Sequence, residues 1–129
     1  MDMKHNEISR IIVDTALYIH RALGPGLLES VYVEVMVYEL RKRGLEVEKE
    51  VPLPVVWEDV RLEIGFRADI IVGGLVIVEC KSVESISSAH KKQLLTYLRL
   101  ADKRLGLLIN FGSELIKDGI FRIVNGLEE

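Results

Sequence analysis

Two short apolar strands joined by a pair of glycines, over residues 68–82, most constrain what this chain can fold into. The segment reads ADIIVGGLVIVECKS, and its acids and its lysine interrupt an otherwise apolar stretch. Side chains alternate between two faces along a strand, so Glu79 and Lys81 share a face. A carboxylate and an ammonium at the end of an apolar strand are costly to bury unless they are paired or bind something. The segment therefore holds either a surface Glu–Lys pair on a half-exposed strand or part of a functional site.

The functional alternative depends on Asp69, which lies on the first of the two strands. Two carboxylates can hold a divalent cation, and a lysine beside them can orient or deprotonate a water. A two-residue loop at the glycines puts Asp69 and Glu79 on opposite faces, whereas a three-residue loop over residues 73–75 sets them directly opposite each other on one face. Glycine accepts the positive φ that three-residue loops commonly need. We therefore expect the three-residue loop, or failing that a β-bulge between the two acids.

Length and composition indicate one globular domain over residues 1–129. Apolar residues make up 49% of the chain and charged residues 29%, which is typical of a folded protein. No apolar run approaches the length of a membrane span, and the N-terminal residues lack the apolar core of a signal peptide. The single cysteine, Cys80, excludes an internal disulfide framework, and no Cys/His cluster has the spacing of a zinc site. These features predict a cytoplasmic protein with no membrane partner.

The net charge of −3, with a pI of about 5.7, bears on the class of partner. It counts against a protein that coats nucleic acid through bulk positive charge. It is compatible with an enzyme that touches a few phosphates, because clustered catalytic acids themselves lower the pI.

Periodicity and turn residues predict the order of elements. The order is helix, helix, three strands with antiparallel character, helix, strand, strand, which predicts an α/β or α+β fold with a central mixed sheet flanked by helices. If the strands on either side of the third helix are parallel, their connection should be a right-handed crossover. Pro52 and Pro54 keep the first strand at a sheet edge or close it. The predicted helices cover residues 6–23 with Asn6 as the cap, 28–43 ending at Gly44, and 88–101 capped by Ser87 or Ser88, and the predicted strands cover 45–56, 61–72, 75–81, 105–111 and 119–124.

Three helical residues have both a structural and a functional interpretation. Glu29 begins the apolar face of the second helix, where it is either a site residue or a first-turn glutamate that favours the helix dipole. Gln93 is the only glutamine in the chain, and it is either functional or a polar residue at the rim of a packed face. His90 lies one turn before it and is either a ligand or a cap-region or surface residue.

Four motifs occur in order along the chain, and together they carry a family resemblance. They are G-x-x-E-x-x-Y at Gly26–Tyr32, Asp69 on a strand, E-x-K at Glu79–Lys81, and H-x-x-Q-x-x-x-Y-L at His90–Leu98. The chain resembles the GxxExxY proteins, a group placed within the PD-(D/E)XK nuclease superfamily, whose restriction-endonuclease-like core is the mixed sheet predicted above. The resemblance extends from the first helix to the strand at Leu105. Ala68 stands where the superfamily name has Pro, and this difference does not touch the chemistry.

The resemblance implies roles for individual residues. It makes Glu29, Asp69 and Glu79 the acids around a Mg²⁺ or Mn²⁺ site, to which the carbonyl of Cys80 adds a further oxygen. Lys81 would position the attacking water and stabilise the charge that builds on the phosphate, and Gln93 would orient that lysine or the water. Independently of the resemblance, we expect some basic residues on or just after the third helix to bind phosphates of the substrate, the alternative being a solvated helix face. The basic residues concerned are Lys91, Lys92, Arg99, Lys103 and Arg104. His90 and Tyr97 of the same helix are candidates for substrate contact, although Tyr97 is equally explained as a packed residue.

The function implied is a metal-dependent nuclease that hydrolyses the phosphodiester bonds of DNA or RNA. The alternative is a non-catalytic nucleic-acid-binding or scaffold module that keeps the nuclease fold. A third hypothesis is a nuclease that works only as a homodimer or with a partner subunit. The sequence favours an enzyme, because Lys81 and all three acids are intact, and a module released from catalysis tends to lose one of them.

Overall fold

The computed structural model describes residues 2–127, apart from the side chains of residues 2, 3 and 64. Helices and strands are mixed as the sequence predicts, and the fold is α+β with a central mixed sheet. In chain order the elements are α1 (Asp2–Leu23), α2 (Glu29–Lys42), β1 (Val47–Trp57), β2 (Val60–Val72), β3 (Val76–Lys81), α3 (Ser88–Ala101), β4 (Leu105–Asn110), the short 3₁₀ helix η1 (Ile116–Gly119) and β5 (Ile120–Val124).

The sheet of the described residues has the strand order β1-β2-β3-β4-β5. β3 and β4 are parallel, and the other neighbouring strands are antiparallel. The parallel pair needs a crossover connection, which α3 supplies. β1 is an edge strand, so Pro52 and Pro54 remove no backbone hydrogen bond from the interior of the sheet.

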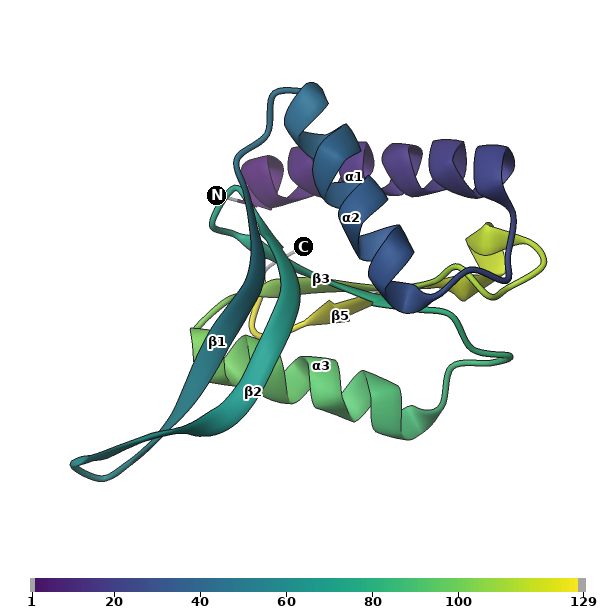
Figure 1. The fold of residues 1–129 in the computed structure, drawn as a ribbon. Coiled ribbons are helices and arrows are strands. Elements are labelled where there is room, and N and C mark those ends of the chain that lie inside the picture. Colours follow the sequence, from purple (N-terminus) through teal and green to yellow (C-terminus); the bar gives the residue numbers. More distant parts are fainter. Residues whose placement is uncertain (1, 128–129) are drawn as a thin grey trace.

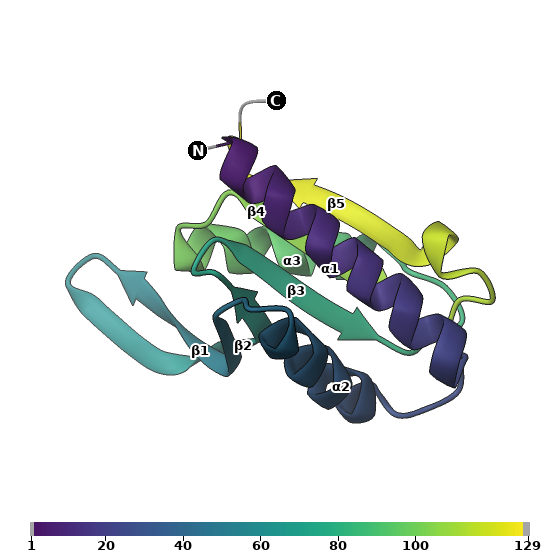
Figure 2. The ribbon, with the colours of Figure 1, turned by 90° about the horizontal axis from the view of Figure 1, so that it is seen from above.

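Helices cover the sheet on both faces (Figures 1 and 2). α1 and α2 pack on one face, against a core that includes Val76, Val78 and Cys80 of β3. α3 packs on the other face, where Leu94 and Leu98 belong to a second cluster with Ile71 and Ile77. β3 is therefore buried on both faces, as a central strand with a parallel neighbour usually is.

Two expectations about β2 are corrected by this arrangement. The alternation along β2 predicts that Asp69 lies on a polar face with its back to the core, but Asp69 is half-buried and lines a hollow together with residues of α2. The apolar residues at the even positions of β2 predict a buried stripe, but two of them, Leu62 and Phe66, are exposed. The pattern showed neither which parts of β2 are covered nor that Ala68 and Ile70 belong to different cores.

The exposure of these residues has a simple origin, because β1 and β2 run beyond the rest of the sheet. β3 pairs with β2 only over residues 70–72, whereas β1 pairs with β2 along nearly its whole length. Residues 53–66 therefore form a projecting two-stranded ribbon, here called the arm, at the lower left of Figure 1. A register shift between Leu53 and Val55 bends it. Gly65 lies at this shift, where an added Cβ would come within 2.6 Å of the carbonyl oxygen of Leu53.

The helix boundaries agree with the sequence in all but one case. α3 begins after Ser87, whose hydroxyl accepts a hydrogen bond from the backbone of His90, and α2 is followed by Gly44 at a φ of 89°. The prediction that Asn6 caps α1 is wrong, because the helix begins earlier and Asn6 lies within it, where its side chain accepts a hydrogen bond from Arg122. Among the helices of residues 2–127, none is long and apolar enough to cross a membrane.

Candidate active site

The β2–β3 hairpin brings the two strand carboxylates together. Its loop is three residues long, over 73–75, and both glycines have positive φ, 61° and 67°. The register pairs Val72 with Val76 and Ile70 with Val78, so the next pair along the hairpin is Asp69 with Glu79. The predicted three-residue loop is confirmed, and so is the predicted register as far as the ladder extends, from Val72 with Val76 to Ile70 with Val78.

The backbone ladder ends at this pair, and the two carboxylates replace the missing carbonyl acceptors. The Glu79 carboxylate accepts a hydrogen bond from the Asp69 amide at 2.8 Å, and the Asp69 carboxylate accepts one from the Cys80 amide at 3.0 Å. Each bond uses one oxygen of its carboxylate, Oε2 of Glu79 and Oδ2 of Asp69. Within residues 2–127 no other hydrogen bond to these carboxylates is found, which leaves the second oxygen of each available to a ligand.

The two acids also perturb each other. Glu79 is only 4% exposed, and burial, followed by repulsion from Asp69, raises its pKa to about 8. Burial raises the pKa of Asp69 as well, against the opposing effects of the Cys80 amide and the Lys81 ammonium. The charged forms of both acids are thus disfavoured without a cation, and the titration belongs to the pair rather than to either residue.

Glu29 approaches the same pair from the first turn of α2. Its carboxylate repels Asp69 and Glu79 and raises the pKa of each. Its Oε2 also accepts a hydrogen bond from the Ser82 amide at 3.3 Å, directly after β3. Glu29 and Asp69 line one hollow of about 300 Å³, together with Ser30, Val33, Glu34, Glu50 and Arg67. Glu29 is therefore both a first-turn glutamate and a neighbour of the acid pair.

The other two residues of the G-x-x-E-x-x-Y motif hold the loop before α2. Gly26 has a φ of 110°, a conformation that residues with a side chain rarely adopt. The hydroxyl of Tyr32 donates to the Gly24 carbonyl at 2.5 Å and accepts from the Leu27 amide at 3.2 Å, while its ring stacks on Phe111. The sequence indicated only that Tyr32 is a core residue. Its hydroxyl ties down the loop that delivers Glu29.

Lys81 and Cys80 complete the E-x-K segment. Lys81 is half-buried, and its ammonium lowers the pKa of both Asp69 and Glu79, so it lies close to the pair. The side chain of Cys80 points away from them into the core beneath α1 and α2, where burial raises the pKa of the thiol. Only the backbone of Cys80 is therefore placed to contribute to the site.

Asn110 is a site neighbour that the sequence analysis missed. It is buried at the end of β4, beside Lys81 in the parallel ladder. Its Oδ1 accepts from the amides of Val83 and Gly112, and its Nδ2 donates to the Val83 carbonyl and to the Ser113 hydroxyl. These bonds hold the segment that follows Lys81. An asparagine after a buried strand resembles an ordinary turn residue, so the sequence carried no clear signal of this role.

The candidate residues of α3 differ in how close the structure places them to the acid pair. Tyr97 is buried, and its pKa is raised by burial and then by Glu79 and Asp69, so the ring lies near the acids. The His90 side chain accepts a hydrogen bond from the Ser87 amide in the helix cap. The Lys91 ammonium lies 4.3 Å from the centre of the Phe121 ring. Two further candidates, Gln93 and Lys92, are exposed to solvent.

The donor set fits a hard divalent cation in kind. Carboxylate and carbonyl oxygens are the ligands that Mg²⁺ and Mn²⁺ prefer, and Mg²⁺ keeps several waters rather than requiring a complete protein cage. Among residues 2–127, no three His, Cys, Asp or Glu side chains converge into a ready-made metal site. Asp69 and Glu79 would supply the nearest oxygens, with Glu29 at the side.

The mixed sheet and its crossover helix define the class of protein, a restriction-endonuclease-like core. The sequence matches the family model of the PD-(D/E)XK nuclease superfamily over residues 6–123, and the chain belongs to that superfamily. No curated protein and no solved structure gave a significant match.

Proposed function

We propose that the chain is a metal-dependent nuclease that hydrolyses phosphodiester bonds of DNA or RNA through Glu29, Asp69, Glu79 and Lys81. Membership of the superfamily suggests nuclease activity. The observation that carries the proposal is the pair of hydrogen bonds that links the two acids across the hairpin, from the Asp69 amide to Glu79 and from the Cys80 amide to Asp69, with the Lys81 ammonium nearby. Lys81 and Arg67 oppose these acids, yet burial and mutual repulsion still raise the pKa of both Asp69 and Glu79, whereas a structural ion pair lowers the pKa of its acid.

The proposal gives each residue a task. Asp69 and Glu79 would hold Mg²⁺ or Mn²⁺ through their available oxygens, with the Cys80 carbonyl as a further ligand and Glu29 at the side. The bound cation would lower the pKa of a coordinated water and offset the charge of the phosphate. Lys81 would orient the attacking water and stabilise the negative charge that develops on the phosphate.

The G-x-x-E-x-x-Y geometry supports a finer assignment, to the GxxExxY group. Gly26 and Tyr32 shape and fix the loop that delivers Glu29 to the acid pair. We propose that this is the role of the three named positions of the motif. On α3, the exposed Lys92 is a further candidate for substrate contact, and the exposed Gln93 is a candidate for orienting Lys81 or the attacking water.

A cleavage assay over a panel of substrates tests the proposed activity. Single- and double-stranded DNA and RNA are incubated with the purified protein in Mg²⁺, in Mn²⁺ and in excess chelator. The proposal predicts cleavage of at least one substrate that depends on the metal. Binding of nucleic acid without cleavage under any metal condition would favour the non-catalytic module instead.

A further inference from the structure

The arm exposes an unusual amount of apolar surface for a two-stranded ribbon. Trp57 is 69% exposed, Val56 62% and Val60 53%, and the partly exposed Leu62 and Phe66 lie on the same ribbon. Isolated ribbons of two strands are marginally stable in water, and exposed apolar patches usually mark interaction surfaces. The arm therefore has the properties of an element that another molecule covers.

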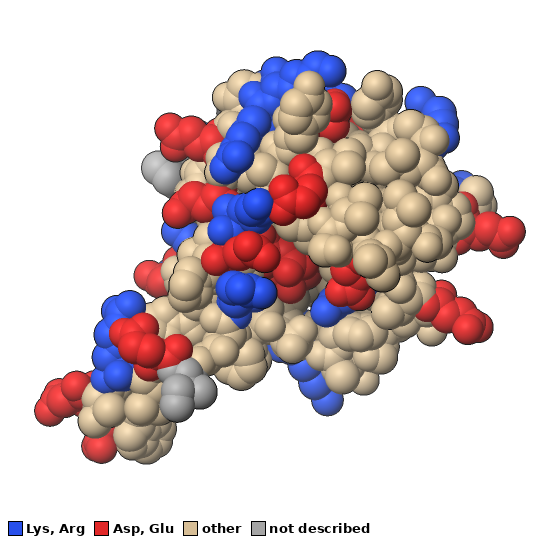
Figure 3. Space-filling view, viewed as in Figure 1, with Lys and Arg blue, Asp and Glu red and all other residues tan. Residues whose placement is uncertain are grey.

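The charges of the arm indicate what kind of molecule that is. Glu58 and Asp59 form its exposed tip, while Arg61 is engaged by Glu63 at 2.6 Å. Figure 3 shows acidic side chains at the tip, at the lower left. A negatively charged tip repels phosphates, so nucleic acid is a poor occupant. A protein surface with exposed cations around an apolar floor is better suited to bind the arm.

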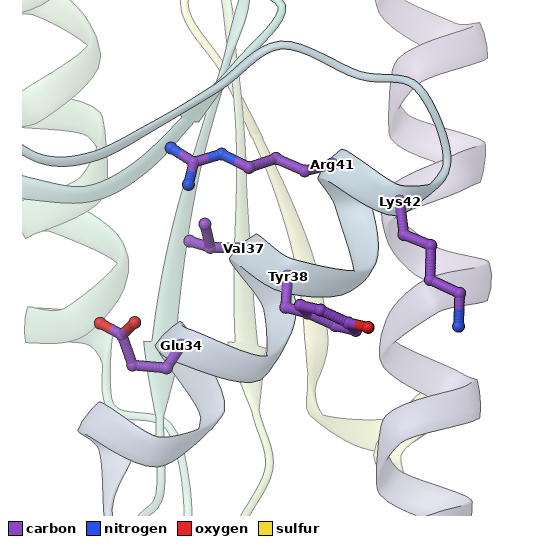
Figure 4. A pocket seen from close by; sticks show the side chains of 5 residues that line it. All are labelled: Glu34, Val37, Tyr38, Arg41 and Lys42. Carbon is purple, nitrogen blue, oxygen red and sulfur yellow. The ribbon is translucent and has the colours of Figure 1, made fainter.

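The outer face of α2 provides such a surface on the same chain. A hollow of about 500 Å³ is lined by Val37, Tyr38, Arg41 and Lys42, with Glu34 at one end (Figure 4). Glu34 pairs with Lys49 at 2.7 Å, and Lys42 lies 3.9 Å from Glu39. The two cations of the lining, Arg41 and Lys42, outnumber its one acid. Tyr38 is 65% exposed, and Lys42 lies 5.9 Å from the centre of its ring. Aromatic side chains and cations of this kind are well suited to bind an acidic, aromatic tip.

The arm tip and the hollow cannot meet within one chain. The tip follows the last residue of β1, Trp57, whereas the hollow is tied to the first, because Arg41 donates a hydrogen bond to the carbonyl of Val47 at 2.8 Å. The 11 residues of β1 separate them by roughly 33 Å at about 3.3 Å per residue. Figure 1 shows the arm and the C-terminal end of α2 at opposite ends of this strand.

A second copy of the chain in antiparallel orientation would cover the exposed arm and would also bring an arm tip to the α2 hollow. A twofold axis beside the middle of β1 would set each arm tip against the α2 hollow of the other copy, and both contacts would then form at once in an isologous interface. Pro52 and Pro54 lie in the middle of this edge and interrupt a continuous backbone ladder between the two strands. We propose that the chain forms a twofold homodimer in which Trp57, Glu58 and Asp59 of each copy dock on Tyr38, Arg41 and Lys42 of the other.

Trp57 is the only tryptophan in the chain, so its fluorescence reports directly on the arm. The intact protein is diluted through the association range while mass is measured by sedimentation and emission is recorded. We expect a monomer–dimer equilibrium in which emission moves to shorter wavelength as the dimer forms, because Trp57 leaves water. A monomer at every concentration, or a dimer with unshifted Trp57 emission, would overturn the proposal.

A charge swap identifies the surface on which the arm docks. Asp59→Lys and Lys42→Glu should each weaken dimerisation about tenfold or more, since each places like charges against each other in the interface. The double variant should recover most of the loss. Lys117→Glu, at an exposed position remote from both surfaces, is the matched control and should dimerise as wild type. Circular dichroism checks that all variants fold. If the folded double variant is as weak as the sum of the single variants, the arm does not dock on α2.

Discussion

Asp69 and Glu79 face each other across the β2–β3 hairpin, and each carboxylate accepts a backbone hydrogen bond at the point where the ladder between their strands ends. The bonds run in both directions: the amide of Asp69 donates to Glu79, and the amide of Cys80 donates to Asp69. Strand backbone thus fixes one oxygen of each acid, so the geometry of the pair does not depend on flexible side chains alone. The predictions below follow from this pair and from the contacts that support it.

The metal-free protein should lose stability as the pH rises from about 4.5 to about 8. The pKa of Glu79 is about 8 in the folded state against an ordinary value of 4.5, so the stability that its retained proton contributes is complete below 4.5 and is lost by the time the pH passes 8. The raised pKa of Asp69 acts in the same direction. Thermal unfolding in excess chelator, repeated across this pH range, measures the pH dependence of the stability.

The matched variant is Glu79→Gln, which keeps an oxygen acceptor for the Asp69 amide and removes the charge. We expect it to flatten the pH dependence and to stabilise the apo protein at pH 8 by on the order of 1 kcal/mol or more. A destabilised Glu79→Gln at this pH would instead identify Glu79 as half of a stabilising ion pair.

Metal binding should depend on Asp69. Calorimetric titration with Mn²⁺ should show one principal site in wild type and none in Asp69→Ala, because the substitution removes a ligand and leaves a single strand carboxylate. Glu46→Ala, at an exposed acid outside the site, is the control and should bind as wild type does. Equal Mn²⁺ affinity in wild type and Asp69→Ala would exclude Asp69 as a metal ligand.

The hairpin register could be predicted from sequence, because a loop that sets Asp69 opposite Glu79 must have an odd length, and two glycines allow it. Which parts of β2 are covered could not be predicted, because the alternation along the strand is the same whether a helix or water lies over it. The role of Asn110 in holding the segment after Lys81 could not be predicted either, for a different reason. Its four hydrogen bonds go mainly to residues 27 positions away or just beyond β4, and such partners are known only once the parallel pair has formed.

Asn110→Ala should both destabilise the protein and weaken metal binding. The substitution leaves the amide and carbonyl of Val83 without their buried partners, at a cost of about 2–4 kcal/mol in unfolding free energy. It also frees the segment whose Ser82 amide holds Glu29, so Mn²⁺ affinity should fall. Ser113→Ala removes only one bond of Asn110 and should cost less than about 1 kcal/mol with unchanged affinity. Unchanged Mn²⁺ affinity in a folded Asn110→Ala would assign the asparagine a purely structural role.

Tyr32→Phe separates the hydroxyl of the motif tyrosine from its ring. The stacking on Phe111 remains, while the bonds to Gly24 and Leu27 are lost, so we expect a cost of about 1–2 kcal/mol in denaturant unfolding. Because the loop that delivers Glu29 loosens, hydrogen exchange at Leu27 and Glu29 should accelerate. Wild-type stability and exchange in this variant would show that the hydroxyl does not hold the loop.

The most direct test of the account is the rate of metal-dependent cleavage by Lys81→Ala. The substitution leaves the carboxylates and their backbone bonds in place, so the variant should fold and bind Mn²⁺ but cleave about 10²–10³-fold more slowly than wild type, because the group that orients water and offsets phosphate charge is gone. Lys49→Ala, an exposed lysine of β1 outside the acid pair, should cleave within a few-fold of wild type. Cleavage by Lys81→Ala at the wild-type rate would contradict the account.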